Sequence, residues 1–241
     1  MHITNLYVVI FSSLCFTAFS FASLFCNSKE SEKSNAGISS EVKDSIDEHP
    51  PVVLSESQSK VLSGAKKNLA EGTEYDLTMG YYVLTFKDGI NTGSRVYPNG
   101  DLKPEIGVCS DVVVRALRIA EVVDLQEAIH EDIKINGRDY PLSRWGNKKP
   151  DTNIDHRRVM NLEVWFTKYW EVISENDFLP GDIVVWDMNE DGASDHIGIV
   201  SDKKVSGRYF VIHNHPDPGH IAEEDKLFRW KLAGHYRIKN R

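Results

Sequence analysis

One cysteine stands apart from the rest of the chain as a candidate nucleophile. Of the three cysteines in the sequence, Cys15 and Cys26 lie in an apolar N-terminal segment, which leaves Cys109 as the one thiol of the remaining chain. A lone cysteine cannot form an intramolecular disulfide or a thiolate metal cluster. It is therefore either a small buried hydrophobic residue or a reactive thiol.

The neighbours of this cysteine predict that it lies at the start of a helix. Pro104 and Gly107 break the chain just before it, and an apolar run over residues 112–120 follows. We expect Ser110 or Asp111 to cap the helix. The N–H groups and the dipole at a helix start lower the pKa of a thiol, so this position favours a nucleophile without excluding a buried thiol.

Two histidines farther along the chain could supply the base that a cysteine nucleophile needs. Apolar patterns predict strands over residues 183–186, 195–200 and 209–214, joined by turns. Neighbouring strands of this kind pair antiparallel. His196, near the start of the second strand, and His213, near the end of the third, then lie at the same end of the sheet. We expect His196 to act as the base and His213 to orient it.

The same part of the chain allows a metal-dependent alternative. Within residues 213–220, four side chains can bind zinc, and a zinc-activated water would then replace the thiolate as nucleophile. They are His213, His215, Asp217 and His220. This alternative leaves Cys109 and His196 without a role, so the cysteine mechanism is favoured.

The turn before His196 resembles the opening of a calcium-binding loop. Position twelve of the loop is Gly198 instead of the bidentate Glu, which excludes an EF-hand. A polar hairpin turn is the simpler interpretation, and calcium binding is the alternative. The candidate ligands are Asp187, Asn189, Asp191 and Asp195.

The chain divides into three parts. Residues 1–26 carry no Asp, Glu, Lys or Arg and indicate a signal peptide, a lipoprotein segment lipidated at Cys26, or an uncleaved membrane anchor. Residues 27–57 are rich in Ser, Glu and Lys and predict a polar, disordered linker. Residues 58–241 hold the folded domain, and all three fates of the N-terminal segment export it from the cytoplasm.

The charge balance argues against one class of partner. The chain has 28 Lys and Arg against 36 Asp and Glu, a formal net charge of −8. Four of these bases and seven of these acids precede residue 61, so residues 61–241 carry 24 − 29 = −5. A protein that binds nucleic acid needs a basic face, so we expect no nucleic-acid partner.

Longer motifs in the domain resemble a known group of enzymes. The helix-start cysteine, a strand histidine within a Pro-Gly-Asp…His-Ile-Gly-Ile-Val pattern and a histidine closing the next strand resemble the NlpC-type branch of the papain-like cysteine peptidases. More closely, the chain resembles DUF1287, a bacterial family of unknown function within that branch. The motifs are Tyr97-Pro98-Asn99-Gly100-Asp101, Gly107-Val108-Cys109-Ser110-Asp111-Val112-Val113, Asp151-Thr152-Asn153-Ile154-Asp155-His156-Arg157-Arg158, Ile212-His213-Asn214 and Gly234-His235-Tyr236-Arg237.

The resemblance implies an α+β, papain-like fold, in which the catalytic cysteine at a helix N-terminus packs on an antiparallel sheet that carries the histidines. Position by position, it implies that Cys109 is the nucleophile, His196 the base and His213 the orienting residue. Tyr97, twelve residues before Cys109, matches a tyrosine whose hydroxyl stabilises the oxyanion together with the Cys109 N–H. A packed turn aromatic is the alternative for Tyr97.

The residues around the nucleophile also offer candidates for substrate binding. The NlpC branch has an Asp just before the cysteine, where it helps to bind a substrate amine, and this chain has Val108 instead. Arginines of the charged stretch 151–158 could hold substrate carboxylates through bidentate hydrogen bonds, or could form an internal salt-bridge loop. The candidates for substrate binding are Ser110, Asp111, Arg157 and Arg158.

We therefore expect an exported cysteine hydrolase of the periplasm or cell envelope that acts on the peptidoglycan stem peptide or another peptide or amide. We expect a monomer without a cofactor, tethered to the membrane if the N-terminal segment is kept. A catalytically inactive module that binds cell-wall peptides is the alternative from another functional class.

Overall fold

A computed structural model describes residues 52–78, 83–146, 149–174 and 176–239. The predicted signal or anchor segment, the lipidation site at Cys26 and most of the predicted linker lie outside the described residues. All the elements below belong to one unit of the chain, Pro50–Arg241. Within the described part, helices that are both long and apolar enough to cross a membrane are absent.

The first helix, α1 (Glu56–Glu71), begins two residues before the predicted domain boundary. Ser55 caps it, because its hydroxyl accepts a hydrogen bond from the Gln58 N–H while the Gln58 side chain accepts one from the Ser55 N–H. This reciprocal pair satisfies two N–H groups that a helix start would otherwise leave unbonded. The helix ends at Gly72, whose φ of 73° is a left-handed conformation that favours glycine.

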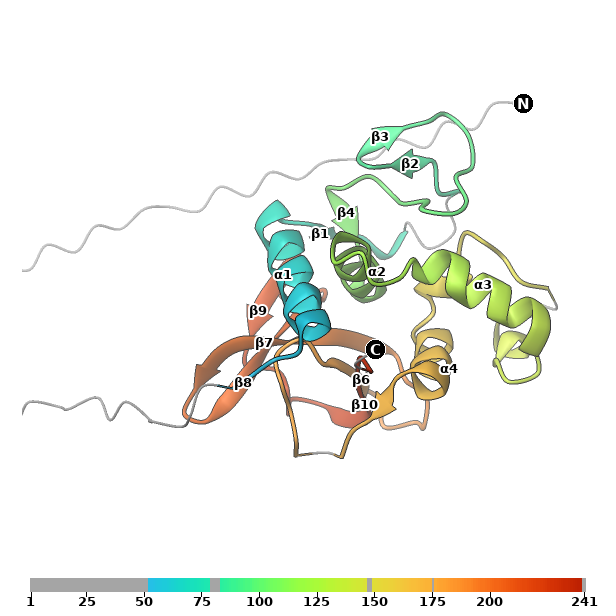
Figure 1. The fold of residues 1–241 in the computed structure, drawn as a ribbon. Coiled ribbons are helices and arrows are strands. Elements are labelled where there is room, and N and C mark those ends of the chain that lie inside the picture. Colours follow the sequence, from blue (N-terminus) through green and yellow to red (C-terminus); the bar gives the residue numbers. More distant parts are fainter. Residues whose placement is uncertain (1–51, 79–82, 147–148, 175, 240–241) are drawn as a thin grey trace, which may run out of the picture. The chain divides into compact units, whose positions relative to one another are not determined.

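The second helix, α2 (Cys109–Ile119), packs along α1, and both helices lie against strands of the main sheet (Figure 1). The contact between the two helices requires a glycine. A Cβ atom at Gly64 would lie 2.3 Å from the backbone oxygen of Ala116, so a larger residue there would push α2 and its first residue, Cys109, away from α1.

The main sheet has six strands and is antiparallel throughout, as the sequence predicts for its central part. The central β6 and β7 pair over Trp186 and His196, and β7 pairs with β8 over Ile199 and Ile212. In spatial order the strands are β5 (Glu171–Val172), β10 (Lys231–Arg237), β6 (Ile183–Asp187), β7 (His196–Val205), β8 (Arg208–Asn214) and β9 (Ile221–Glu224).

Alternation along the strands gives the sheet two buried faces. Ile197, Ile199 and Ile212 join Cys109 and the apolar residues of α2 in the larger core. Trp186 belongs to a second, smaller core on the other face. Burial on both faces fixes the register of the central strands, because a shift by one residue would move every side chain to the wrong face.

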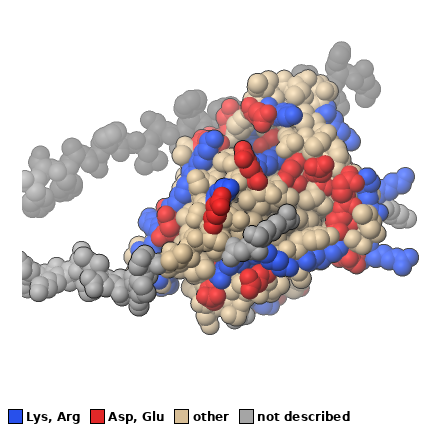
Figure 2. Space-filling model, in the orientation of Figure 1, with Lys and Arg blue, Asp and Glu red and all other residues tan. Residues whose placement is uncertain are grey.

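The remaining elements lie around these helices and the sheet. The short strands β1 (Glu74–Tyr75) and β4 (Ile106–Gly107) pair in parallel, which ties the segment before α2 to the segment after α1. On the face of the molecule seen in Figure 2, basic and acidic side chains are intermingled. The other elements are β2 (Phe86–Lys87), β3 (Ile90–Asn91), α3 (Leu125–Asn136), α4 (Val159–Tyr169) and the 3-10 helices η2 (Leu142–Trp145) and η3 (Asp155–Arg157).

Candidate active site

The two predicted histidines are hydrogen-bonded neighbours. His196 is the first residue of β7, His213 lies near the end of β8, and His196 Nε2 lies 2.8 Å from His213 Nδ1. Both residues are buried, with 2% and 1% of their surface exposed. Gly198 leaves room for the pair, since a Cβ atom there would lie 3.2 Å from the Cβ of His213 and 3.3 Å from the ring of Trp186.

A glutamate that the sequence did not single out fixes the proton positions in this pair. Glu224 on β9 places Oε2 3.1 Å from His213 Nε2. An ionised carboxylate only accepts hydrogen bonds, so His213 Nε2 carries a hydrogen and Nδ1 accepts one from His196 Nε2. This leaves His196 Nδ1 as the unprotonated nitrogen, the form in which an imidazole can act as a base.

Burial keeps both imidazoles uncharged. It lowers the pKa of His196 well below its ordinary value, and the nearby His213 and His215 act in the same direction. It lowers the pKa of His213 to about 3, with further contributions from His215 and Lys226. At neutral pH both imidazoles are therefore unprotonated.

Helix α2, which begins with Cys109, lies against β7, the strand that begins with His196. Cys109 is 8% exposed, and the nearby Ile197 and Ser110 N–H groups lower the pKa of its thiol. Ile197 directly follows His196 on β7.

The protonation state of the thiol differs from the expectation. Burial raises the pKa of Cys109 to about 12, and it outweighs the Ile197 N–H of β7, the Ser110 N–H of the helix start and the charge of Arg157, which lower this pKa. The charge of Asp111 also raises it. At neutral pH the Cys109 thiol is therefore protonated and the His196 imidazole uncharged.

Of the two predicted capping residues, Asp111 caps the start of α2. The N-cap residue itself is Val108, and Asp111 Oδ2 accepts a hydrogen bond from the Val108 N–H at 2.8 Å. Ser110 is 0% exposed and Asp111 4% exposed, so burial places both away from a position where a bound peptide could contact them directly.

The partner of Asp111 is Arg157, the first of the two predicted substrate arginines. The Arg157 Nε and Nη2 atoms lie 2.8 Å and 3.0 Å from the two carboxylate oxygens, and both side chains are buried. Burial alone would raise the pKa of Asp111, but the charge and hydrogen bonds of Arg157 lower it to about 2. Arg157 thus forms an internal ion pair, as the alternative for this stretch predicts, with a carboxylate from α2, and Arg158 interacts electrostatically with Asp155.

The hydroxyl of Tyr97, the predicted oxyanion tyrosine, is bound to another residue, and Tyr75 lies in electrostatic range of the thiol. The Tyr97 hydroxyl donates to Glu131 Oε1 at 2.7 Å, on α3. Burial raises the pKa of Tyr75, and negative charge at Cys109 raises it further, so the Tyr75 phenol lies within electrostatic reach of the thiol. Tyr75 pairs with Gly107 across β1 and β4. A two-residue strand gives no periodicity, so the sequence offered no signal for this position.

A buried asparagine joins the nucleophile segment to the histidine strand. Asn214 directly follows His213, is 0% exposed, and its Nδ2 lies 3.4 Å from both the Thr73 and the Gly107 backbone oxygens. The Ile221 N–H donates to the same Thr73 oxygen at 2.8 Å. These bonds hold together the segments that carry Tyr75, Cys109 and His213.

The carboxylates of the acidic hairpin accept hydrogen bonds from N–H groups within the same turn. Asp187 accepts hydrogen bonds from the Asp191 and Gly192 N–H groups, and Asp195 from the Met188 N–H and the Asn189 side chain. This is the polar turn that was the simpler interpretation.

The zinc candidates are likewise dispersed. His213 binds His196 and Glu224, and His215 Nδ1 lies 3.2 Å from the Asp217 N–H of its own turn. Among residues 52–239, leaving out the gaps in the description, no group of three or more His, Cys, Asp or Glu is arranged to hold a metal ion.

Comparison with known proteins agrees with the motifs. The family model described as "Domain of unknown function (DUF1287)" matches residues 84–238. An Escherichia coli (strain K12) protein called "Uncharacterized protein YijF" is 42% identical over 196 residues, which cover 78% of this chain and 86% of that protein.

Two crystal structures of an N-acetylmuramoyl-L-alanine amidase from Bacteroides uniformis are more distant. They have 13% and 14% sequence identity and TM-scores of 0.46 and 0.45, and the matches cover 77% of this chain and 100% of each of theirs. These scores are too low to carry a functional argument.

Proposed function

The chain belongs to the DUF1287 family, and we propose that it is a papain-like cysteine hydrolase that cleaves peptide or amide bonds through the Cys109 thiol. One observation carries the proposal: His196 Nε2 lies 2.8 Å from His213 Nδ1, and the N–H of the next residue on β7, Ile197, is near enough to the Cys109 thiol to lower its pKa. Nucleophile, base and orienting residue are thus provided by α2, β7 and β8.

In the proposed reaction, His196 Nδ1 takes the thiol proton as the sulfur attacks the substrate carbonyl. His213 and Glu224 hold the imidazole in the required tautomer and stabilise the positive charge that forms on it. The C–N bond then breaks, His196 gives the proton to the leaving amine, and a thioester on Cys109 remains. Water, deprotonated by His196, hydrolyses the thioester, releases the carboxylic acid and restores the thiol.

The oxyanion formed in both steps needs donors that are already in place. The Cys109 N–H belongs to the first turn of α2, whose N–H groups have no partner within the helix. Tyr75 on β1 pairs with Gly107, two residues before Cys109, and its phenol is within electrostatic range of the thiol. These two groups form the proposed oxyanion hole, and Tyr75 takes the role that the resemblance gave to Tyr97.

The substrate class proposed is the stem peptide of peptidoglycan, and the place of action is the periplasm or cell envelope. The resemblance of the Cys109, His196 and His213 motifs to the NlpC-type branch supports the substrate. The uncharged, apolar residues 1–26 support export.

The full chain incubated with purified muropeptides tests this proposal, with the products identified by mass spectrometry. We expect cleavage at one amide bond, loss of cleavage in Cys109→Ala, and full activity in the presence of a chelator. A zinc hydrolase would survive Cys109→Ala and fail with the chelator, and a binding module would retain peptide without product. Either result would overturn the cysteine mechanism, and Cys109→Ala should melt within a few degrees of the parent chain.

A further inference from the structure

A cleft of about 530 Å³ adjoins the nucleophile segment, and four apolar side chains from four segments of the chain line it. They are Leu77, Val108, Trp145 and Ile154. None of the four belongs to the two hydrophobic cores of the described residues, and Leu77 is 69% exposed. Apolar side chains that converge on a concave surface instead of a core are typical of ligand-binding grooves.

The cleft begins beside the candidate nucleophile. Val108 directly precedes Cys109, and Leu77 lies two residues after Tyr75, the proposed oxyanion donor. The pairing of Tyr75 with Gly107 across β1 and β4 holds these two segments together. Residues of an extended peptide follow one another at about 3.5 Å, so a peptide bound at Cys109 reaches the cleft within one or two residues.

The two arginines that also line the cleft are compensated within the protein. The Arg157 Nε and Nη2 atoms bind both carboxylate oxygens of Asp111, and Arg157 is 7% exposed. The charge of Arg158 acts on the buried Asp155, and its guanidinium lies over the ring of Trp145, 4.3 Å from the ring centroid. The described lining residues include no Asp or Glu. The cleft therefore offers apolar walls, and carboxylates of the protein already meet the charge of its arginines.

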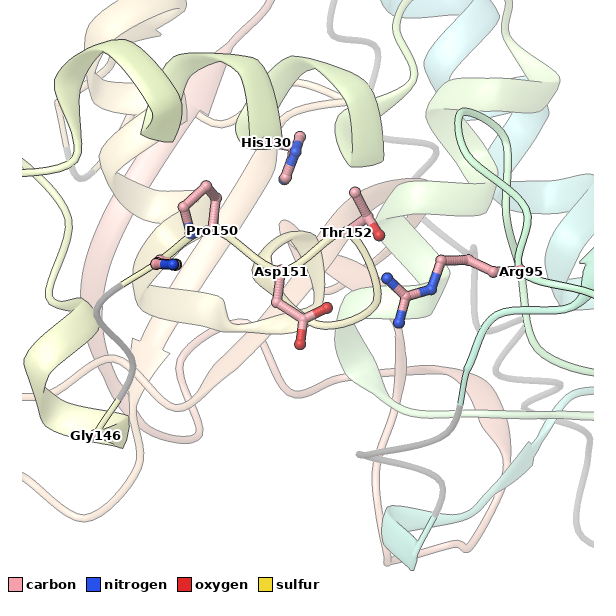
Figure 3. Close-up of a pocket in the computed structure, with 7 residues that line it drawn as sticks. Arg95, His130, Gly146, Pro150, Asp151 and Thr152 are labelled. Carbon is pink, nitrogen blue, oxygen red and sulfur yellow. The ribbon is translucent and has the colours of Figure 1, made fainter.

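A second cavity has a different character. It measures about 640 Å³ and is lined mainly by polar and charged side chains, which include Arg95, His130 and Asp151 (Figure 3). In Figure 3 the guanidinium of Arg95 faces the side of the cavity where Asp151 lies, so basic and acidic groups are mixed there. Of the two, the cleft beside Val108 is the one suited to an apolar ligand.

We propose that the cleft is a subsite for an apolar residue of the substrate, within two positions of the scissile bond, and that it discriminates against charged residues there. Packing of the side chain on Leu77, Val108 and Trp145 removes apolar surface from water, which tightens binding about fourfold per buried methylene group. A charged residue would lose hydration in the same place without gaining an ionic partner. The inference rests on the proposed function, because it names the substrate class of the same site.

Binding to an inactive chain tests the cleft separately from catalysis. The full chain carrying Cys109→Ala is titrated calorimetrically with four peptides, acetyl-Ala-Xaa-Ala-amide with Xaa as Ala, Leu, Glu or Lys. Both ends are blocked, so only Xaa can carry a charge. We expect the Leu peptide to bind about tenfold more tightly than the Glu and Lys peptides, and about threefold or more tightly than the Ala peptide.

Leu77→Ser removes one apolar wall, and Ile90→Ser is the matched control. Both side chains are 69% exposed, so neither substitution disturbs a core, and Ile90 lies on β3 and outside the lining of the cleft. We expect Leu77→Ser to reduce the preference for Leu over Glu by about threefold or more, and Ile90→Ser to leave it unchanged.

Three results would overturn the inference: binding of the Glu or Lys peptide as tight as that of the Leu peptide, no binding of any peptide at millimolar concentration, or a preference that Leu77→Ser leaves unchanged. An apolar preference without turnover of any peptide by the intact chain would instead reject the hydrolase and leave the apolar subsite standing. Cleavage by the intact chain without this preference would reject the subsite and leave the hydrolase standing.

Discussion

The two histidines near His196 have different roles, although strand alternation puts them on the same face. His213 is hydrogen-bonded to His196 at 2.8 Å, whereas the His215 ring makes an edge contact with it at 5.3 Å between centroids. We expect His213→Ala to lower kcat/KM by about a hundredfold or more, since the base loses its orientation, and His215→Ala to lower it less than tenfold. Steady-state kinetics on one muropeptide gives the ranking, and the reverse order would remove His213 from the proposed mechanism.

Two tyrosines offer an equally direct comparison. Tyr75 lies within electrostatic reach of the thiol, and the Tyr97 hydroxyl is bound to Glu131 at 2.7 Å. Loss of one oxyanion donor lowers kcat by about a hundred- to a thousandfold in known enzymes, so we expect a fall of this order for Tyr75→Phe and little change for Tyr97→Phe. Both variants keep the ring and its packing. A large loss in Tyr97→Phe alone would return the oxyanion role to the residue that the sequence motif indicated.

At the scale of elements, local sequence patterns predicted the strands that carry the histidines and the helix that begins at Cys109. Alternating apolar residues gave strands β6, β7 and β8, and antiparallel pairing then brought His196 and His213 together. The break at Gly107 before an apolar run placed Cys109 at the start of α2. Each of these inferences needs only the period of a strand, a turn or a helix stop.

The features of the candidate site that the sequence did not predict depend on contacts between segments that are distant along the chain. Tyr75 is placed by a two-residue parallel pairing between β1 and β4, and Glu224 reaches His213 from the next strand of the sheet. The pair of Asp111 and Arg157 joins residues 46 positions apart. The pKa of Cys109 was predicted in the wrong direction, because a helix start is visible in a sequence and the depth of burial is not.

The Asp111–Arg157 pair fixes the start of α2 to the segment before α4, so its loss should lower the free energy of unfolding. In Asp111→Ala, the buried Arg157 guanidinium loses its bidentate carboxylate and the Val108 N–H loses its acceptor. Breaking a buried pair on one side costs about 3–5 kcal/mol, and we expect a loss of this size in urea unfolding. Asp225→Ala, which breaks the exposed pair with Arg208, should cost below about 1 kcal/mol. Equal losses in both variants would mean that the buried pair does not anchor the helix.

Over the whole molecule, the fold keeps several histidines neutral in its interior. His156, His196 and His213 are each 2% exposed or less, and burial lowers the pKa of all three, in His213 to about 3. The unfolded chain has no such constraint, and its histidines titrate near pH 6.5. The same burial that makes His196 a neutral base therefore makes the stability of the entire domain dependent on pH.

The sign of this dependence follows from proton uptake. Below about pH 6.5 the unfolded chain binds protons at these three positions and the folded chain does not, so the free energy of unfolding falls by about 1.4 kcal/mol per pH unit for each histidine. Asp155 offsets the effect of one histidine between about pH 4 and 6, because burial raises the pKa of Asp155 in the folded chain to about 6 and proton binding there stabilises the folded chain.

From pH 6.5 to pH 5 we expect the free energy of unfolding to fall by about 4 kcal/mol in total, measured by urea unfolding at each pH. His156→Gln should reduce the slope by about 1.4 kcal/mol per pH unit, and the exposed His220→Gln should leave it unchanged. Equal stability at pH 5 and pH 6.5 would show that these imidazoles take up protons in the folded chain as they do in the unfolded chain, which would contradict their burial as neutral rings.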